Sequence, residues 1–215
     1  MRREDLEAIA KVLKDTNIMI ASDEIYSELT YSGKHCSIAE IEGMRERTIV
    51  INGFSKSFAM TGWRLGFLGG PKEIVSQMLK LHQYAIMSSP TVSQYAAIVA
   101  MHSCQKDIDA MRNEYNIRRR FVVDSFNKLG LKCFAPQGAF YVFPCIKSTG
   151  MTSTDFCEKL VYTKKVAVVP GDAFGECGEG YVRVSYAYSL NHLREAIKRI
   201  GEFLEDIKNG KRAVI

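Results

Sequence analysis

The spacing of hydrophobic residues changes several times in the first third of the chain. Leu6, Ile9 and Leu13 recur on one helix face, which predicts an amphipathic helix over residues 1–15. Three short apolar runs follow, each of a length typical of a buried strand, at residues 17–21, 48–52 and 64–70. Because runs of this kind are typical of sheets covered by helices on both faces, we expect three parallel strands.

Helical periodicity dominates the middle of the chain. A helix is predicted from Pro71, followed by an alanine-rich helix at 91–101 and a long charged helix at 106–129 that stops at Gly130. The expected apolar face of the first helix comprises Ile74, Met78, Leu81 and Ala85. The expected apolar stripe of the long helix comprises Ile108, Met111, Tyr115, Val122, Phe126 and Leu129.

The last third alternates short strands with helices. Strands are predicted at 139–144, 166–169 and 181–186, and helices at 153–162 and 191–208. The last helix has an unbroken apolar stripe, made of Leu193, Ile197, Ile200, Leu204 and Ile207.

This change of pattern predicts two parts. Residues 1–105 are expected to form part of a larger α/β domain with a mostly parallel sheet. Residues 106–215 are expected to form the long helix and a smaller α+β domain. Three strands are few for a parallel sheet and would leave an apolar edge exposed. The sequence therefore has the pattern of the back half of a larger protein.

Composition and charge exclude several classes of protein. The chain has 215 residues, of which 47% are hydrophobic and 25% charged, as in ordinary globular proteins. Its net charge of +5 is modest, and the cluster Arg118–Arg120 is typical of a solvated helix face, so no nucleic acid is expected as a partner. We expect no membrane span and no secretory leader, and therefore a cytoplasmic location, because long apolar runs are absent.

The cysteines indicate reduced thiols. None of the six forms a C-x-x-C pair, and the four histidines lie at no zinc-ligand spacing from them. We therefore expect neither a disulfide framework nor a metal site.

A run of polar residues and glycines separates the second and third predicted strands. It contains Ser55, Lys56 and Arg64, and it lies at a strand end, where open α/β sheets bind ligands. A lysine flanked by hydroxyls and glycines is suited to a phosphate or a carbonyl group. The alternatives are that Lys56 is a solvated loop lysine and that Arg64 is a surface charge.

A second polar group, Ser22 to Tyr26, follows the first predicted strand. Asp23 could accept a hydrogen bond from a ligand nitrogen, and Tyr26 could reach the same ligand. The alternative is that Asp23 caps the next turn and Tyr26 packs in the core.

Together, the two polar groups resemble the class I/II aminotransferases, which are pyridoxal-phosphate enzymes of fold type I. The motif D-E-I-Y begins at Asp23, and Lys56 follows 33 residues later within S-K-S-F-A-M-T-G-W-R-L-G. Downstream, P-Q-G-A-F-Y at 136–141, V-P-G at 169–171 and Y-V-R-V-S-Y-A at 181–187 also agree with the family. The resemblance covers essentially the whole chain. It implies the back half of the family's large α/β domain, followed by its small carboxy-terminal α+β domain.

The resemblance implies a role for each residue of the two polar groups. Lys56 would bond covalently to the aldehyde of pyridoxal 5'-phosphate and then move a proton at the substrate α-carbon. Asp23 would pair with the pyridine nitrogen, and Tyr26 would hydrogen-bond the phenolic oxygen. Ser55 and Arg64 would bind the phosphate.

The resemblance also implies a substrate site and a homodimer. The side chain of Arg183, in an alternating strand, would bind the substrate α-carboxylate, although an exposed strand arginine is the alternative from pattern alone. Phe140 is a weaker candidate for the wall of the substrate pocket, since a strand aromatic more often packs in a core. The substrates would be an amino acid and a 2-oxo acid. Some relatives have a phosphate-binding serine where this sequence has Gly53.

Several alternatives remain open at this level. The family's front half, which supplies further groups around the cofactor, has no counterpart in this sequence, so the chain is expected to be a carboxy-terminal portion. The same lysine, aspartate and arginine would also suit a carbon–sulfur β-lyase, a cyclopropane-carboxylate synthase or a decarboxylating condensing enzyme. An inactive truncated chain is a further alternative. A dinucleotide dehydrogenase is disfavoured because no G-x-G-x-x-G follows a strand.

Overall fold

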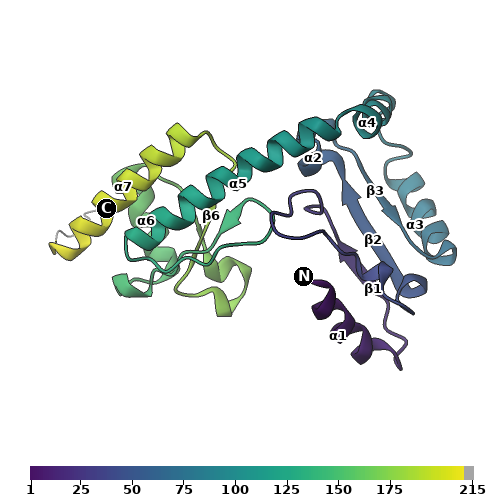
Figure 1. Ribbon diagram of the computed structural model, residues 1–215, viewed down its shortest axis with the longest axis horizontal. Helices are drawn as coiled ribbons and strands as arrows, with labels where there is room; N and C mark the ends of the chain where they lie inside the picture. Colours follow the sequence, from purple (N-terminus) through teal and green to yellow (C-terminus); the bar gives the residue numbers. More distant parts are fainter. Residues whose placement is uncertain (211–215) are drawn as a thin grey trace. The chain divides into compact units, whose positions relative to one another are not determined.

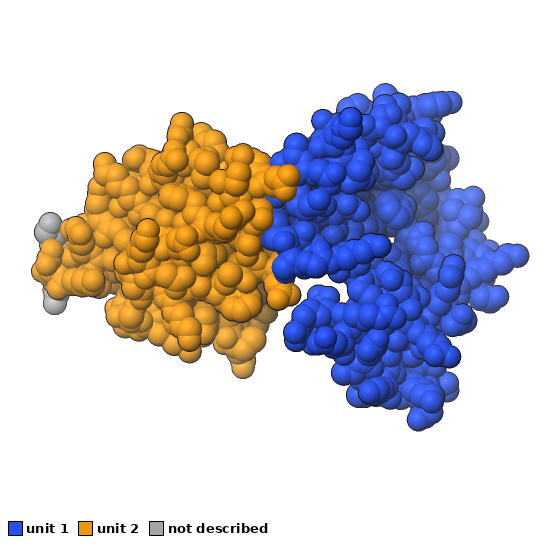
Figure 2. Space-filling model, in the orientation of Figure 1, with its two compact units in different colours: residues 1–112 blue, residues 113–215 orange. Residues whose placement is uncertain are grey.

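The computed structural model describes residues 1–210 and divides into two compact units, Met1–Arg112 and Asn113–Ile215, coloured separately in Figure 2. The division falls within helix α5 (Gln105–Lys128). Each unit has its own sheet and is described by itself.

The sheet of the first unit has the strand order β1-β2-β3 (Figure 1). The strands are β1 (Ile20–Asp23), β2 (Thr48–Gly53) and β3 (Gly66–Gly69). β1 and β2 are parallel, but β3 is antiparallel to β2, so the prediction of three parallel strands is wrong for the third. The short connection 54–65 returns the chain at the same end of the sheet, and Gly66 therefore pairs with Gly53.

Three of the four helices of the first unit agree closely with the predicted ranges, and the short helix that follows β2 was not predicted. The helices are α1 (Arg3–Leu13), α2 (Phe54–Ser57), α3 (Lys72–Ala85) and α4 (Thr91–Ser103), with short 3-10 turns η1 (Ile38–Glu40), η2 (Arg45–Arg47) and η3 (Thr61–Trp63). Three positions predicted on apolar helix faces are wrong, because Ile9 and Ala85 are exposed and Leu81 is 73% exposed. Within the described chain no residue of α3 is buried.

Two small apolar clusters stabilise the first unit. One joins α1 to the segment around η1 and consists of Leu6, Ala10, Ile38, Ile41 and Met44. The other joins α2 and η3 to α4 and consists of Phe54, Met60, Ala97 and Ala100. Two residues of the second cluster, Phe54 and Met60, flank Lys56 in the sequence, so the cluster anchors the segment that follows β2.

The second unit has a small antiparallel sheet with the strand order β4-β6-β5. The strands are β4 (Tyr141–Val142), β5 (Val169–Pro170) and β6 (Val182–Ser185), all shorter than the apolar patterns predicted. The helical elements are the second half of α5, α6 (Ser153–Lys164), α7 (Leu190–Lys208) and the turns η4 (Lys147–Thr149), η5 (Gly171–Phe174) and η6 (Glu176–Gly178).

The core of the second unit draws on its helices and its sheet. Its buried side chains include Val122, Phe126, Phe156, Leu160, Val182, Tyr186, Leu193, Ile200 and Phe203. Hydroxyl side chains cap both later helices: Thr152 accepts from the Asp155 amide at 3.1 Å, and Ser189 accepts from the His192 amide at 3.3 Å. These caps fix where α6 and α7 begin.

Candidate active site

Parallel pairing brings the two polar groups of the first unit together. Asp23 is the last residue of β1 and pairs with Ile51 of β2, and the next amide, of Glu24, donates to the Ile51 carbonyl at 2.8 Å. The carboxyl ends of adjacent parallel strands lie at one edge of a sheet, where open α/β folds bind ligands. The segment after β1 and the lysine segment after β2 therefore leave the sheet side by side.

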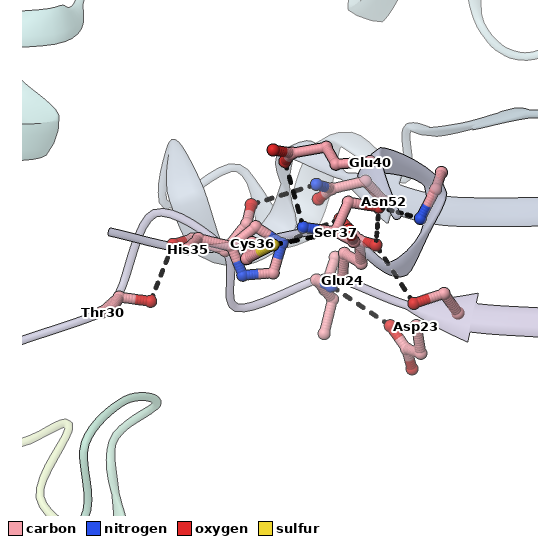
Figure 3. A network of polar contacts seen from close by, with 12 residues as sticks. Asp23, Glu24, Thr30, His35, Cys36, Ser37, Glu40 and Asn52 are labelled. Carbon is pink, nitrogen blue, oxygen red and sulfur yellow. Dashed lines mark hydrogen bonds and ion pairs between the residues drawn. The ribbon is translucent and has the colours of Figure 1, made fainter. Parts of the chain in front are cut away.

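Two further contacts join these segments. The Asn52 side-chain amide donates to Ser27 Oγ at 3.1 Å, and Asn52 Oδ1 accepts from the Gly53 amide at 2.7 Å (Figure 3). Asn52 thus connects the residue after Tyr26 to the start of α2.

Gly53 allows close packing at this junction. A Cβ atom here would lie 3.2 Å from Ile25 Cδ1 and 3.3 Å from both Gly66 Cα and the Leu65 carbonyl oxygen. These distances are shorter than ordinary van der Waals contacts, so a serine at this position would force its neighbours apart. The close packing favours glycine at this position.

The short helix α2 orients Ser55 and Lys56. Phe54 and Ser57, one turn apart, are buried, whereas Ser55 and Lys56 between them are half-buried. The Phe54 ring packs against Phe58 with centroids 5.2 Å apart. The buried pair therefore fixes the helix and turns Ser55 and Lys56 away from the core.

Arg64 returns to the same region through a left-handed turn. Arg64 has φ +53°, and its Nη1 donates to the Thr61 carbonyl at 2.9 Å. The carbonyl of the next residue, Leu65, accepts a hydrogen bond from the Phe54 amide at 3.2 Å. The backbone just before Ser55 is therefore in contact with the backbone just after Arg64. The left-handed conformation is uncommon for residues other than glycine, so the surrounding contacts must maintain it.

Asp23 and Tyr26 occupy the turn that follows β1. Asp23 is exposed, and its Oδ1 accepts from the Ile25 amide at 3.2 Å, as in the turn-capping alternative. Tyr26 is half-buried, and its carbonyl accepts from the Leu29 amide at 2.9 Å. The capping bond holds the Asp23 carboxylate at the strand end.

Glu24 is a buried carboxylate to which the sequence analysis gave no role. It is 9% exposed and accepts hydrogen bonds from Ser22 Oγ at 3.1 Å, Ser37 Oγ at 2.5 Å and the His35 ring at 2.8 Å (Figure 3). Burial alone would raise the pKa of Glu24, but the bonds from Ser37, His35 and Ser22 outweigh it and hold the pKa below the ordinary value. Asp23, beside it, points away from this network. Two of the three partners of Glu24, His35 and Ser37, lie more than ten residues away along the chain, so only the motif D-E-I-Y could have indicated this network.

Arg183 and Phe140 lie in the second unit. The predicted alternation in β6 is seen in part: Val182 and, just after the strand, Tyr186 are buried, but Val184 is half-buried like Arg183. Arg183 and Tyr141 line a cavity of about 570 Å³. Phe140 stacks between Tyr115 and Tyr141, with centroids 5.5 and 4.8 Å apart.

Other reactive groups in the described residues are inert or scattered. Burial raises the pKa of both Cys133 and Cys157 to about 11, so these thiols stay protonated at neutral pH. Across residues 1–210 no group of three or more His, Cys, Asp and Glu side chains could hold a metal ion. Within the same residues no helix has the length and apolar character needed to cross a membrane.

Comparison with known proteins identifies the family. The family model "Aminotransferase class I and II" matches residues 1–200. The chain belongs to the class I and II aminotransferases. Among curated aminotransferases it is 46% identical over 211 residues to the aspartate aminotransferase of Pyrococcus abyssi, and 46% identical over 211 residues to the aromatic-amino-acid aminotransferase 2 of Thermococcus litoralis. Both alignments cover 97% of this chain and 54% of the relative.

The fold is also that of an aminotransferase. The crystal structure of the aromatic aminotransferase from Pyrococcus horikoshii OT3 matches with a TM-score of 0.94 and 45% identity, over 97% of this chain and 57% of that one. The fold is therefore fold type I aminotransferase-like with mixed α/β content. The chain spans about half the length of the aminotransferases that it matches.

Aminotransferases of this family work with pyridoxal 5'-phosphate, and the donor groups at the sheet edge fit that cofactor. A lysine amine suits its aldehyde, an aspartate carboxylate suits its pyridine nitrogen, and a hydroxyl with a guanidinium suits its phosphate. All of these groups are on the segments that β1, β2 and β3 bring to one edge.

Proposed function

We propose that this chain provides the lysine-bearing half of a pyridoxal-phosphate-dependent aminotransferase. The reaction moves an amino group between an amino acid and a 2-oxo acid. Two relatives that are equally similar to this chain are named for aspartate and for aromatic amino acids. The proposal therefore covers amino acids and 2-oxo acids as a class and does not specify the substrate side chain.

The observation that supports the proposal is the placement of Asp23 and Lys56. They follow adjacent parallel strands, and the Asn52–Ser27 bond and the close packing at Gly53 hold their segments together. An acid and an amine at one sheet edge suit a ligand that has a basic ring nitrogen and an aldehyde.

The residues of the first unit have complementary tasks in this proposal. When bound, the cofactor supplies an aldehyde for covalent attachment and a ring that withdraws electrons. The Lys56 amine attaches the cofactor and moves the proton at the substrate α-carbon. Asp23 keeps the ring nitrogen protonated, and Tyr26 donates to the ring's phenolic oxygen. Ser55 and Arg64 bind the phosphate, with Arg64 as the charged partner.

Arg183 and Phe140 form the substrate part of the proposal. The planar guanidinium of Arg183 suits the α-carboxylate that every amino acid and 2-oxo acid substrate shares. Phe140, which is half-buried, contributes an apolar wall. From the family to which the chain belongs, we also propose that the functional protein is a cytoplasmic homodimer.

Cofactor binding tests the proposal directly. The chain is titrated with pyridoxal 5'-phosphate and the visible absorption is recorded for the wild type, Lys56→Arg and Lys72→Arg. We expect a new visible band in the wild type and in Lys72→Arg, which changes an exposed lysine of α3, and no band in Lys56→Arg. An unchanged band in Lys56→Arg would refute the assignment.

A further inference from the structure

Two aromatic rings contact the guanidinium of Arg183. Arg183 Cζ lies 4.3 Å from the ring centroid of Phe174 and 4.6 Å from that of Tyr141. Both distances are well inside the range of attractive cation–π contacts. The rings come from different elements, Phe174 from η5 and Tyr141 from β4.

Strand pairing explains how the rings reach Arg183. Tyr141 pairs with Ser185, which lies two residues from Arg183 on the same face of β6, so its ring reaches Arg183 diagonally. On the other side, Val169 of β5 pairs with Arg183, and η5 with Phe174 follows β5 directly. Both neighbours of β6 therefore deliver an aromatic ring to the same side chain.

Each of the two rings has a second ring in contact with it. Phe143 meets Phe174 edge to face, with centroids 5.8 Å apart. Phe140 contacts Tyr141 at 4.8 Å and is itself in contact with Tyr115 of α5 at 5.5 Å. These contacts restrict the rotamers of both rings, so the position of Arg183 is restricted in turn.

A guanidinium that lies against an aromatic ring by its face keeps its edge for hydrogen bonding. A guanidinium donates N–H groups in its own plane, and two of them match the oxygens of a carboxylate. An arginine held by its face loses less side-chain entropy when a carboxylate binds at its edge.

We propose that Tyr141 and Phe174 are positioning residues that hold Arg183 ready for a carboxylate and so set the affinity for the substrate. This inference rests on the proposed role of Arg183 as the carboxylate-binding residue. If the rings only filled space, their replacement would change stability and leave carboxylate affinity unchanged.

The test measures carboxylate binding in the 215-residue chain without cofactor. 2-Oxoglutarate is titrated while NMR follows the Arg183 Nε–H signal, which is assigned by its loss in Arg183→Met. Phe174→Leu and Tyr141→Leu remove one ring each. Phe174→Tyr and Tyr141→Phe keep the ring, and Phe134→Leu changes a phenylalanine of the same unit that is 77% exposed. Thermal unfolding is recorded for every variant.

We expect each leucine variant to weaken 2-oxoglutarate binding about fivefold, the fold-change that corresponds to one cation–π contact of about 1 kcal/mol. The ring-keeping variants and Phe134→Leu should stay within about twofold of the wild type. The melting temperatures of the variants should not change in parallel with their affinities for 2-oxoglutarate, because Phe174 is half exposed.

Three results would overturn the inference. Wild-type affinity in both leucine variants would remove the positioning role while leaving Arg183 as the carboxylate site. Either no saturable shift in the wild type or unchanged binding in Arg183→Met, measured by calorimetry, would remove the Arg183 site as well. Cofactor attachment at Lys56 is measured separately, so a failure there is distinguishable from a failure here.

Discussion

Asp23 and Glu24 are adjacent carboxylates with opposite surroundings. Asp23 is exposed at the end of β1, where a ligand can reach it, whereas Glu24 is buried among Ser22, Ser37 and His35. Successive side chains of an extended segment point to opposite sides, which separates the two environments. One carboxylate is therefore available for chemistry and the other connects the turn to the loop before η1.

Glu24 should stabilise the first unit in a pH-dependent way. Because its folded pKa lies below the ordinary value of 4.5, its contribution is present above that pH and is lost as the pH falls through the folded pKa. We expect Glu24→Gln to lower the free energy of unfolding by about 1–3 kcal/mol at pH 7, as for a hydrogen-bonded charge. Urea unfolding at a series of pH values measures this.

The exposed Glu42 provides the matched control. Glu42→Gln should change the free energy of unfolding by less than about 0.5 kcal/mol at every pH. For Glu24→Gln, the loss of free energy of unfolding should become smaller as the pH falls below 4.5. The reason is that protonation of Glu24 then removes the charge from the wild type as well. A loss independent of pH would show that the charge of Glu24 does not stabilise the fold.

The residues of the candidate site differ in how well sequence predicts them. Asp23, Lys56 and Arg64 stand in motifs that resemble the family, and the parallel pairing of β1 with β2 agrees with the expectation that the segments of Asp23 and Lys56 leave the sheet at one edge. The Glu24 network and the rings around Arg183 depend on residues that are distant along the chain. No local pattern marks such contacts, so only the fold reveals them.

At the level of secondary structure, the direction of β3 is the main error of the sequence prediction. A short apolar run indicates a strand but not its direction. The connection of residues 54–65 is occupied by α2 and η3, so the chain turns back beside β2. The helices were predicted more closely, because 3.6-residue periodicity persists over several turns of α3, α5 and α7.

Gly53 tests how tightly these elements pack. Gly53→Ser should lower the free energy of unfolding by about 1–3 kcal/mol, because the new side chain would overpack against Ile25, Leu65 and Gly66. Gly69→Ser is the control, since a Cβ atom at this strand glycine meets nothing within 4 Å. Denaturant unfolding measures both variants. An equal loss of free energy of unfolding in the two would contradict the packing explanation.

At the scale of the whole molecule, the first unit exposes an unusual amount of apolar surface. Helices α3 and α4 and the connection between them expose large side chains, among them Leu81 at 73%, Tyr84 at 94%, Met87 at 80% and Tyr95 at 69%. Surfaces of this kind mark interaction sites in soluble proteins. They agree with a chain that spans about half the length of its relatives.

The 215-residue chain alone should therefore be a poor catalyst. Attachment of the cofactor requires a reactive amine and a weakly held phosphate, but turnover requires much tighter positioning, since an error of about 1 Å can cost roughly a hundredfold in rate. A coupled assay with 2-oxoglutarate and mixed amino acids measures this. Turnover within about tenfold of the ordinary enzyme range of roughly 1–1000 per second would show that the remaining half of the relatives is dispensable.

The most direct measurement maps where the cofactor attaches. The chain is incubated with pyridoxal 5'-phosphate, reduced with borohydride so that a carbon–nitrogen double bond becomes a stable amine, and digested for mass spectrometry. We predict a single pyridoxyl adduct, on the peptide that contains Lys56, which disappears in Lys56→Arg. An adduct on Lys72 or Lys80, or label spread evenly over the lysines of the chain, would contradict the assignment of Lys56 as the attachment residue.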